Sequence, residues 1–440
     1  MAGKVDETIA DMTAAAAFGP DIQLVSFELE RLHTGLDQFA SCVLYGTATV
    51  DDRDGRRHDH RLVFKYKHPT LEKREFYNND SQFHNETLFY ERIAPFLLAS
   101  RGAQRNGNVT ATPTLCRYFY GRNDCDEQAH RDVIVLENES VRGYRTAVTS
   151  HRLTLDFDHL TVALRTLAKF HGLSYRAKHE DSVKFKKTVA DVKETQWSED
   201  GEWIFHPSVL QGLFSVALDR LKQRHVAAGG CGDNEVEWIF RFQTELLTDA
   251  MQSLRRIVVP VEPMAVLCHG DFNRNNLLFR YDDCGRPVDA LAYDMATIRY
   301  GSPVLDLSFF LYMNADRQTR DDHWDELLDA YCATLAADAG DVPVPGREQL
   351  DAEIREYGFY GLVHVSYFAG VMLEETIQVD VDEFLDADEF KMLSLLLRNG
   401  GEPATEWFAD AIQHFIRCKY ARAPAPSTVA NKDCIPDDIL

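Results

Sequence analysis

The sequence predicts an α+β fold, in which a small antiparallel β-sheet is followed by a mainly helical part. β-like segments dominate the first third of the chain, whereas apolar residues in most later segments recur at helical spacing. With 440 residues and 45% hydrophobic content, the chain is long enough to form two lobes with separate cores.

The composition argues against two classes of partner. A net charge of −23 would be repelled by a nucleic-acid backbone and by an anionic membrane surface. No apolar run approaches the length of about 18 residues that suggests a membrane span, and no signal peptide is visible. Nine cysteines without a C-x-x-C pair are typical of reduced thiols, so a cytoplasmic protein is expected. The sequence does not indicate an oligomeric state.

The predicted sheet begins with three strands. The β-like segments are Gln23 to Leu32, Ala40 to Val50 and Arg61 to Lys67, with a charged turn from Asp51 to Asp59. The turn between the first two strands contains Gly35, and backbone N–H groups in such a turn can cover phosphate groups. Gly35 is therefore a candidate nucleotide-binding residue, although a turn with one glycine is more typical of an ordinary hairpin.

A helix from about Ser81 to Leu98 carries an acidic residue within its apolar stripe. The apolar stripe consists of Phe83, Phe89, Tyr90, Ile93 and Leu97. Glu86 lies inside it, and an unpaired buried carboxylate costs several kcal/mol, on the order of the penalty for any buried ion. We expect Glu86 to pair with Lys65, which lies on a strand among apolar neighbours. The alternative is that Glu86 reaches solvent at the edge of the stripe.

A buried strand and a series of helices follow. The apolar run from Asp132 to Asn138 ends in polar residues, which predicts a buried strand leading into a linker. From Asp156 the pattern becomes helical, and His171 on the apolar face is expected to be a hydrogen-bonded core histidine. The further helices are expected at Val209–Arg224, Glu235–Arg256, Asp322–Ala336, Arg347–Glu374, Glu383–Arg398 and Thr405–Ala421.

The segment from His269 to Asn276 is the most informative part of the chain. Asp271 is followed five positions later by Asn276, and Asp294 follows the second of two short predicted strands. A hairpin made of these strands would bring Asn276 and Asp294 side by side. A carboxylate that can accept a hydroxyl proton, together with two oxygen ligands suited to Mg²⁺, is typical of a phosphoryl-transfer centre. The Lys65–Glu86 pair would hold the lysine amine toward nucleotide phosphates.

Three residues near this segment have structural roles in the favoured interpretation. Cys268 ends an apolar run and is expected to pack as a small hydrophobic side chain. Asp306 follows Pro303 at the start of a helix, and we expect it to cap that helix or brace a loop rather than bind metal. Arg274 could neutralise a transferred phosphate, but a solvated loop position is favoured.

Six segments together resemble the ecdysteroid-kinase-like family, relatives of choline kinases and aminoglycoside phosphotransferases. The segments are Leu62–Lys65, Phe83–Pro95, Val135–Asn138, Leu167–His171, His269–Asn276 and Tyr300–Leu307. They occur in the order and spacing of that family, over about residues 20 to 420. The resemblance implies a two-lobed protein-kinase-like fold that transfers the γ-phosphoryl group of ATP to a hydroxyl group of a small molecule.

The resemblance also implies domain limits and roles for single residues. Residues 1–20 would be an N-terminal extension, 21–138 the nucleotide-binding lobe, 139–421 the helical lobe and 422–440 a mobile tail. Asp271 resembles the catalytic base, while Asn276 and Asp294 resemble Mg²⁺ ligands. Lys65 and Glu86 resemble the phosphate-positioning ion pair. Glu137 and Asn138 match the chain between the lobes that contacts adenine, mostly through backbone groups.

Two departures from the family pattern leave alternatives open. Phe272-Asn273 stands where the family often has Leu-Trp, and Asp294-Met295-Ala296 where Asp-Phe-Gln is common. The acceptor would be an ecdysteroid or another hydroxylated lipophilic metabolite or xenobiotic. A catalytically weak or inactive small-molecule-binding protein is one alternative, and a choline- or ethanolamine-type kinase is another. A protein kinase is disfavoured, since the Gly-rich and Ala-Pro-Glu signatures are missing.

Overall fold

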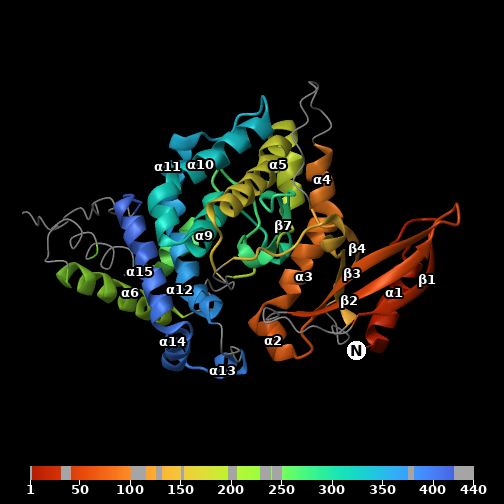
Figure 1. Cartoon of the computed structure of the whole chain (residues 1–440), viewed down its shortest axis with the longest axis horizontal. Coiled ribbons are helices and arrows are strands. Elements are labelled where there is room, and N and C mark those ends of the chain that lie inside the picture. The colour runs from red at the N-terminus through yellow and green to blue at the C-terminus, as the bar shows by residue number, and fades with distance from the viewer. Residues whose placement is uncertain are drawn as a thin grey trace, which may run out of the picture.

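The structure, a computed structural model, describes residues 2–30, 41–100, 115–124, 131–149, 153–196, 206–227, 239, 250–374 and 381–420. A five-stranded antiparallel sheet with a few helices forms one side of the molecule, and helices dominate the other side (Figure 1). The predicted α+β class is therefore confirmed. In the described part of the chain, we find no helix with the length and hydrophobicity needed to span a membrane.

The N-terminal part contains the sheet and the helices that cover it. Its elements are α1 (Ala2–Ala14), β1 (Gln23–Leu29), β2 (Ser41–Asp51), β3 (Arg57–Lys67), α2 (Leu71–Phe76), α3 (Asn79–Leu88), the π-helical turn η1 (Phe89–Ile93), α4 (Ala94–Ala99), β4 (Tyr118–Arg122) and β5 (Val133–Glu137). The strand order is β1-β2-β3-β5-β4, so β3 is the central strand. Lys65 pairs with Val43 on one side and Ile134 on the other, which fixes its position in the middle of the sheet.

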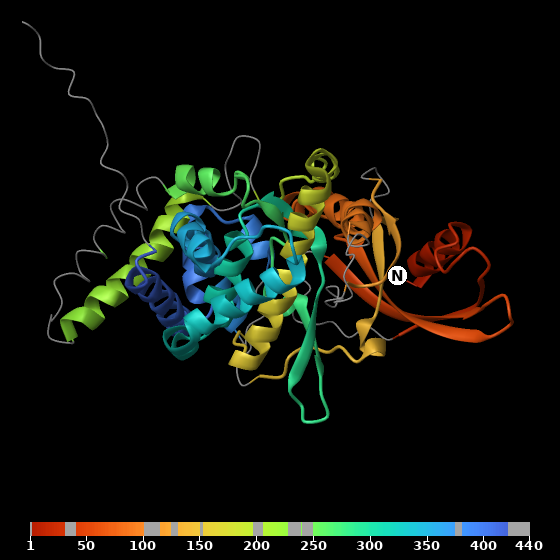
Figure 2. The same cartoon turned by 90° about the horizontal axis from the view of Figure 1, so that it is seen from above.

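Helix α1 covers one face of the sheet and was not expected from the sequence. Val5, Ile9 and Met12 are buried with the apolar side chains of β3, including Leu62 and Phe64. Figure 2 shows α1, in red, beside the sheet. These three apolar residues of α1 recur at spacings of four and three, which is the helical signal that the sequence interpretation overlooked.

The C-terminal part is mainly helical and holds two short two-stranded sheets. Its elements are η3 (Glu139–Arg142), α5 (Phe157–Val189), α6 (Pro207–Ala227), α8 (Ala250–Ile257), β6 (Val266–Cys268), η5 (Arg274–Asn276), β7 (Leu277–Tyr281), β8 (Pro287–Ala292), η6 (Met295–Thr297), β9 (Arg299–Gly301), α9 (Val304–Asn314), α10 (Arg317–Ala339), α11 (Arg347–Tyr357), α12 (Phe359–Leu373), α13 (Val381–Leu385), α14 (Glu389–Arg398) and α15 (Gly401–Arg417). β6 pairs with β9, and β7 pairs with β8.

Several predicted element limits were wrong. β3 begins at Arg57, within the expected charged turn, because residues 57–61 pair with β2. The single helix expected over Arg347–Glu374 is broken at Gly358, a residue with low helix propensity. The helix expected over Glu383–Arg398 is also two helices, and Asp388 caps the second by accepting a hydrogen bond from Lys391 N at 2.8 Å.

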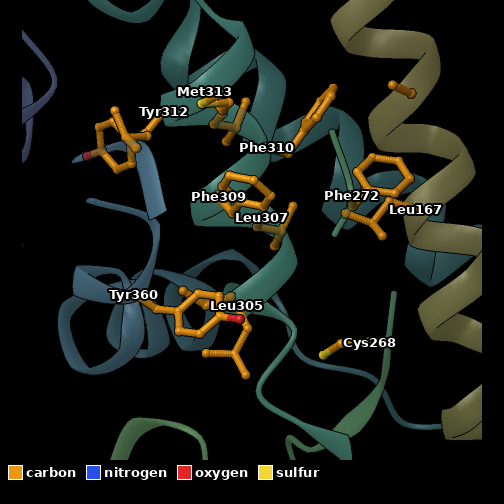
Figure 3. Packing of buried hydrophobic residues seen from close by; sticks show 14 of the residues in the cluster. Leu167, Cys268, Phe272, Leu305, Leu307, Phe309, Phe310, Tyr312, Met313 and Tyr360 are labelled. Carbon is orange, nitrogen blue, oxygen red and sulfur yellow. The ribbon is translucent and has the colours of Figure 1, made fainter. Parts of the chain in front are cut away.

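Helices α5, α9 and α12 form the centre of the helical core. Figure 3 shows Phe309 and Phe310 of α9 packed among Leu167 of α5, Tyr360 of α12 and Phe272. Every residue of α9 is buried, so this helix has no solvent-facing side. Since the loop after β6 carries Phe272, burial of that ring anchors the loop to the core.

Candidate active site

Lys65 and Glu86 form the ion pair that the sequence predicts. Lys65 Nζ lies 2.7 Å from Glu86 Oε2, and the Glu86 side chain is 1% exposed. The expected stripe of α3 and its continuation is buried around Glu86, with Phe83 and Phe89 nearly inaccessible to solvent. Burial raises the pKa of Glu86 above its ordinary value, although the charge of Lys65 opposes this shift. The alternative in which Glu86 reaches solvent is therefore wrong.

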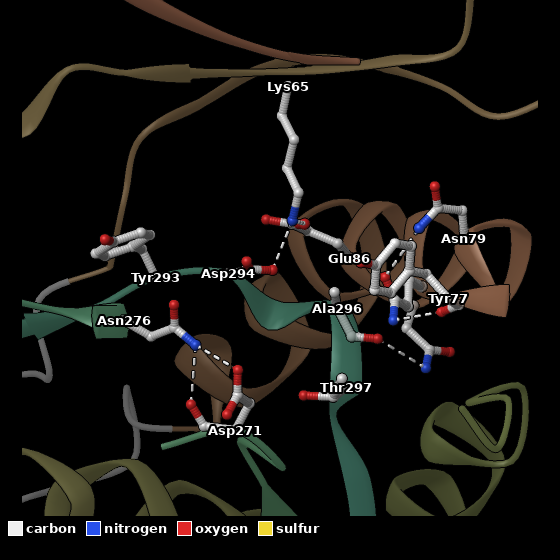
Figure 4. Close-up of polar contacts among 12 residues, drawn as sticks. Lys65, Tyr77, Asn79, Glu86, Asp271, Asn276, Tyr293, Asp294, Ala296 and Thr297 are labelled. Carbon is white, nitrogen blue, oxygen red and sulfur yellow. Dashed lines mark hydrogen bonds and ion pairs between the residues drawn. The ribbon is translucent and has the colours of Figure 1, made fainter. Parts of the chain in front are cut away.

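Asp294 contacts the same lysine from the helical part of the chain. Lys65 Nζ lies 2.6 Å from Asp294 Oδ1 (Figure 4). Burial alone would raise the pKa of Asp294, but the charge and hydrogen bond of Lys65, together with the charge of His269 and a hydrogen bond from the Ala296 backbone, hold this pKa below its ordinary value. Asp294 has a left-handed backbone with φ of 65°, an uncommon conformation for a non-glycine residue. Such strain is frequent at functional sites.

Asp271 is held by two asparagine side chains. Asn276 Nδ2 donates to Asp271 Oδ2 at 2.8 Å, and Asn273 Nδ2 donates to Asp271 Oδ1 at 2.6 Å. Burial and the charge of Asp294 raise the pKa of Asp271 to about 7, despite both hydrogen bonds. A carboxylate with this pKa is suited to accept a proton near neutral pH.

Asn276 and Asp294 lie next to each other as the hairpin prediction requires. β7 begins directly after Asn276, β8 ends two residues before Asp294, and Tyr293 N donates to Asn276 O at 3.0 Å. Because Asn276 uses its Nδ2 on Asp271, its amide oxygen is turned away from Asp271 (Figure 4). One amide oxygen and one carboxylate are suitable ligands for Mg²⁺, so these two residues fit the ion that the sequence implies.

Asp306 braces the start of the Asp271 loop. Its two carboxylate oxygens accept hydrogen bonds from His269 N at 2.7 Å and Gly270 N at 2.8 Å. His171 Nε2 lies 3.1 Å from Asp306 Oδ2, and His171 Nδ1 lies 2.8 Å from the Tyr331 hydroxyl. These contacts confirm that Asp306 braces a loop and that His171 is a hydrogen-bonded core histidine.

Cys268 lies close to His171 and Asp306, but hydrogen bonds already engage all three side chains. Ligand atoms of the three residues lie within 4.8 Å of one another. However, Cys268 Sγ donates to Ser302 O at 3.3 Å. His171 and Asp306 are hydrogen-bonded to each other, and Asp306 also accepts from His269 N and Gly270 N. Cys268 is fully buried, as expected for a cysteine that packs as a small hydrophobic residue.

Arg274 is not a solvated loop residue, so the favoured prediction for it was wrong. Its side chain donates hydrogen bonds to backbone carbonyl groups. Arg274 Nη1 donates to Thr154 O at 3.1 Å, and Nη2 donates to Ala147 O at 2.9 Å. The guanidinium therefore fastens the loop to the segment that precedes α5. Sequence spacing could not reveal these partners, since backbone carbonyls carry no residue-specific signal.

The structure places Glu137 and Asn138 at the end of β5, directly before η3. Glu137 N donates to Arg117 O and Asn138 N donates to Arg61 O, both at 2.8 Å. These two N–H groups are thus used in pairing with neighbouring segments. The Glu137 side chain lies near His60, on the sheet face opposite Lys65. That these residues contact adenine stays a prediction. Because their N–H groups are already paired, such a contact would use the backbone carbonyl groups of Glu137 and Asn138.

Gly35 and the predicted tail 422–440 lie outside the described residues.

Asn85 is a residue of the site that sequence reasoning missed. Its buried side chain donates from Nδ2 to Lys193 O at 2.9 Å and to Ala296 O at 3.3 Å, and accepts from Lys193 N at 2.8 Å. Asn85 therefore ties α3, next to Glu86, to two segments of the helical part. An asparagine within the predicted apolar-striped helix was the available signal, because buried amides require partners.

Met295 and Ala296 occupy buried positions directly after Asp294. Met295 is fully buried and lines a cavity of about 10 Å³ with Phe170, His269 and Phe272. That volume is at the lower limit for holding one water molecule, so Met295 fills nearly all of the available space. The packing around Met295, directly after Asp294, is therefore dense.

Comparison with known families gives one match that covers more than half of the chain. A model described as the ecdysteroid kinase-like family matches residues 35–342. No curated protein matches the sequence.

Solved structures of small-molecule kinases show a weaker similarity. An ethanolamine kinase from Plasmodium vivax is 11% identical, with 90% of this chain and 82% of that chain covered and a TM-score of 0.35. A microcompartment-associated aminopropanol kinase is 12% identical, with coverages of 94% and 99% and a TM-score of 0.40. An amicoumacin kinase in complex with AMP-PNP and Ca²⁺ is 13% identical, with coverages of 91% and 96% and a TM-score of 0.36. At these TM-scores, the structural likeness supports no argument about substrate.

Proposed function

Because the chain belongs to the ecdysteroid kinase-like family, we propose that it is an ATP- and Mg²⁺-dependent kinase that phosphorylates a hydroxyl group of a small molecule. One observation supports this proposal above all others. Lys65 contacts both Glu86 and Asp294, although 229 positions separate Lys65 from Asp294. In the proposed function, this arrangement would unite a phosphate-binding cation, its buried anchor and a metal-binding carboxylate at one place.

The proposed reaction moves one phosphoryl group and one proton. The acceptor hydroxyl oxygen forms a bond to the γ-phosphorus of ATP, the bond from that phosphorus to the β,γ-bridging oxygen breaks, and ADP leaves. Asp271 accepts the hydroxyl proton, as its pKa of about 7 allows. Lys65 would bind the nucleotide phosphates, and Asn276 and Asp294 would hold Mg²⁺. When bound, Mg²⁺ neutralises negative charge that develops on the phosphate oxygens.

The acceptor is proposed to be an ecdysteroid or another hydroxylated lipophilic metabolite or xenobiotic. The family match supports this class, while the fold alone is equally compatible with an amino alcohol such as choline or ethanolamine. We further propose a cytoplasmic location. Six of the nine cysteines belong to the described residues, and all six are free thiols, as a reducing compartment requires.

Stabilisation by Mg²⁺-ATP tests whether the site binds nucleotide. A ligand at about 100 times its Kd stabilises a folded protein by roughly 2.7 kcal/mol, which appears as a higher Tm. We expect Mg²⁺-ATP to raise the Tm and Mg²⁺-ATP hydrolysis to be measurable without an acceptor. A protein that shows neither effect would be a non-catalytic binder with a kinase-like fold.

A further inference from the structure

Asn273 uses both ends of its side-chain amide within the Asp271 loop. Its Nδ2 donates to Asp271 Oδ1 at 2.6 Å and lies 3.3 Å from Asp271 O. Its Oδ1 accepts a hydrogen bond from Asn275 N at 2.8 Å, so Asn273 also caps the short turn η5. Asn273 stands where the family often has tryptophan, and the family pattern therefore assigns it no role.

The two contacts of Asn273 have different chemical requirements. Capping η5 needs only a side-chain oxygen, which serine, threonine or aspartate supplies as well as asparagine. Holding Asp271 at the same time needs a donor, which an ionised aspartate lacks and which serine or threonine can supply only from the same hydroxyl that would cap η5. Among these four residues, only asparagine carries the acceptor and the donor on two separate atoms. The presence of asparagine thus satisfies both requirements, whereas a cap alone would not explain the donated bond.

The donated bond completes the support of the Asp271 carboxylate. Asn276 holds Oδ2 from the other side at 2.8 Å, so each carboxylate oxygen receives one amide hydrogen bond. Donors on both oxygens fix the rotation of the carboxylate plane. A base must lie within hydrogen-bond reach of the acceptor hydroxyl in one orientation, and misplacement by about 1 Å can lower a rate about 100-fold.

We propose that Asn273 is a positioning residue for phosphoryl transfer, which orients the Asp271 carboxylate toward the acceptor hydroxyl through its side-chain N–H. This inference rests on the proposed kinase function. Asn273 does not exchange a proton in this scheme, because the proton passes from the acceptor hydroxyl to Asp271. Loss of the Asn273 side-chain amide should therefore lower kcat, while the KM for ATP stays close to the wild-type value.

Three substitutions separate positioning from capping. Asn273→Asp retains an oxygen that can cap η5 but removes the donor, Asn273→Ser leaves one hydroxyl for both contacts, and Asn273→Ala removes both functions. Asp316→Ala is a matched control, since Asp316 caps α10 by accepting from Thr319 N at 2.8 Å and is not part of the site. The probe is Mg²⁺-ATP, with water as the acceptor, and kcat, KM and Tm are measured for each protein.

Positioning predicts that the aspartate variant, which has no donor and whose carboxylate would repel Asp271, loses about 10-fold or more in kcat, with the KM for ATP nearly unchanged. The serine variant should lose less than the alanine variant, because its hydroxyl can act as a donor or as a cap. If both variants keep the wild-type kcat and only the alanine variant is impaired, Asn273 is merely a cap and the inference is overturned. If the wild-type protein neither binds nor hydrolyses Mg²⁺-ATP, the proposed function fails and this inference fails with it.

Discussion

Lys65 and Asp294 are joined by an ion pair of 2.6 Å between Nζ and Oδ1. The lysine lies on the central strand of the sheet, and the aspartate follows a hairpin of the helical part. Glu86 contacts the same ammonium group at 2.7 Å. Glu86 is buried and Lys65 largely so, while Asp294 is partly exposed, so the buried ammonium and carboxylate depend on each other for a partner and Asp294 adds a second partner for Lys65. Nucleotide phosphates would enter this network by sharing the Lys65 ammonium.

Lys65→Met is expected to remove most of the stabilisation by Mg²⁺-ATP, because the variant cannot pair with phosphate. Lys73→Met is the control, since Lys73 is paired with Asp382 outside the site at 2.6 Å. Thermal unfolding with and without Mg²⁺-ATP measures the difference. An equal nucleotide-induced rise in Tm for Lys65→Met and wild type would exclude Lys65 from phosphate binding.

Gly270→Ala is expected to disrupt the loop that carries Asp271. Gly270 has a φ of +84°, and a Cβ atom there would lie 1.8 Å from Thr297 O. A left-handed backbone costs roughly 1–2 kcal/mol with a Cβ atom, and overpacking adds roughly 1–3 kcal/mol. Gly285→Ala is a matched control, because its φ is +77° and its Cβ would contact nothing within 4 Å.

Chemical denaturation distinguishes the two glycine variants. Gly285→Ala should show only the backbone penalty, while Gly270→Ala should lose more stability and also ATP turnover. Equal losses of unfolding free energy in the two variants would show that contact with Thr297 does not constrain the loop.

The sequence was sufficient to predict the contacts that depend on buried charge and local pairing. Glu86 inside an apolar stripe required a cation, and the two short strands required a hairpin next to Asp294. The contacts of Asn85 and Arg274 could not be predicted, because their partners are backbone carbonyls of Lys193, Ala296, Ala147 and Thr154. Such partners have no side-chain signature, and tertiary packing alone brings them within reach. The domain limits and the role of each site residue remain predictions.

Asn85→Ala tests whether the amide bonds of Asn85 hold α3 against the helical part. Removing the side chain takes a partner away from the buried Ala296 carbonyl and breaks two hydrogen bonds with the Lys193 backbone, at a cost on the order of 1–3 kcal/mol. His84→Ala is the control on the same helix, since it removes only a solvent-exposed contact with Asp191 O at 2.9 Å. Urea unfolding should show the larger loss for Asn85→Ala. Similar losses for both variants would contradict a special role for Asn85.

Stability is expected to fall on acidification below about pH 6.5, the usual pKa of histidine in an unfolded chain. Burial lowers the pKa of His364 to about 3 and that of His414 to about 4. The folded protein therefore binds fewer protons than the unfolded chain at intermediate pH. Each histidine should contribute a loss of about 1.4 kcal/mol per pH unit between its folded and unfolded pKa values.

His364→Gln and His414→Gln should each reduce this pH dependence by about one proton. The free energy of unfolding, measured by urea denaturation from pH 7 to pH 4.5, gives the slope for each protein. A variant that retains the wild-type slope would show that its histidine is not buried in the neutral form.

Asp271→Asn tests the central claim most directly, because it removes the base while preserving the size of the side chain. Wild-type and variant proteins are incubated with Mg²⁺-ATP and a library of hydroxylated metabolites, and mass spectrometry measures phosphorylated products. We predict a phosphorylated product with the wild type and a rate at least about 100-fold lower with Asp271→Asn, while the rise in Tm with Mg²⁺-ATP persists. Equal product formation by the two proteins would contradict the assignment of Asp271 as the base.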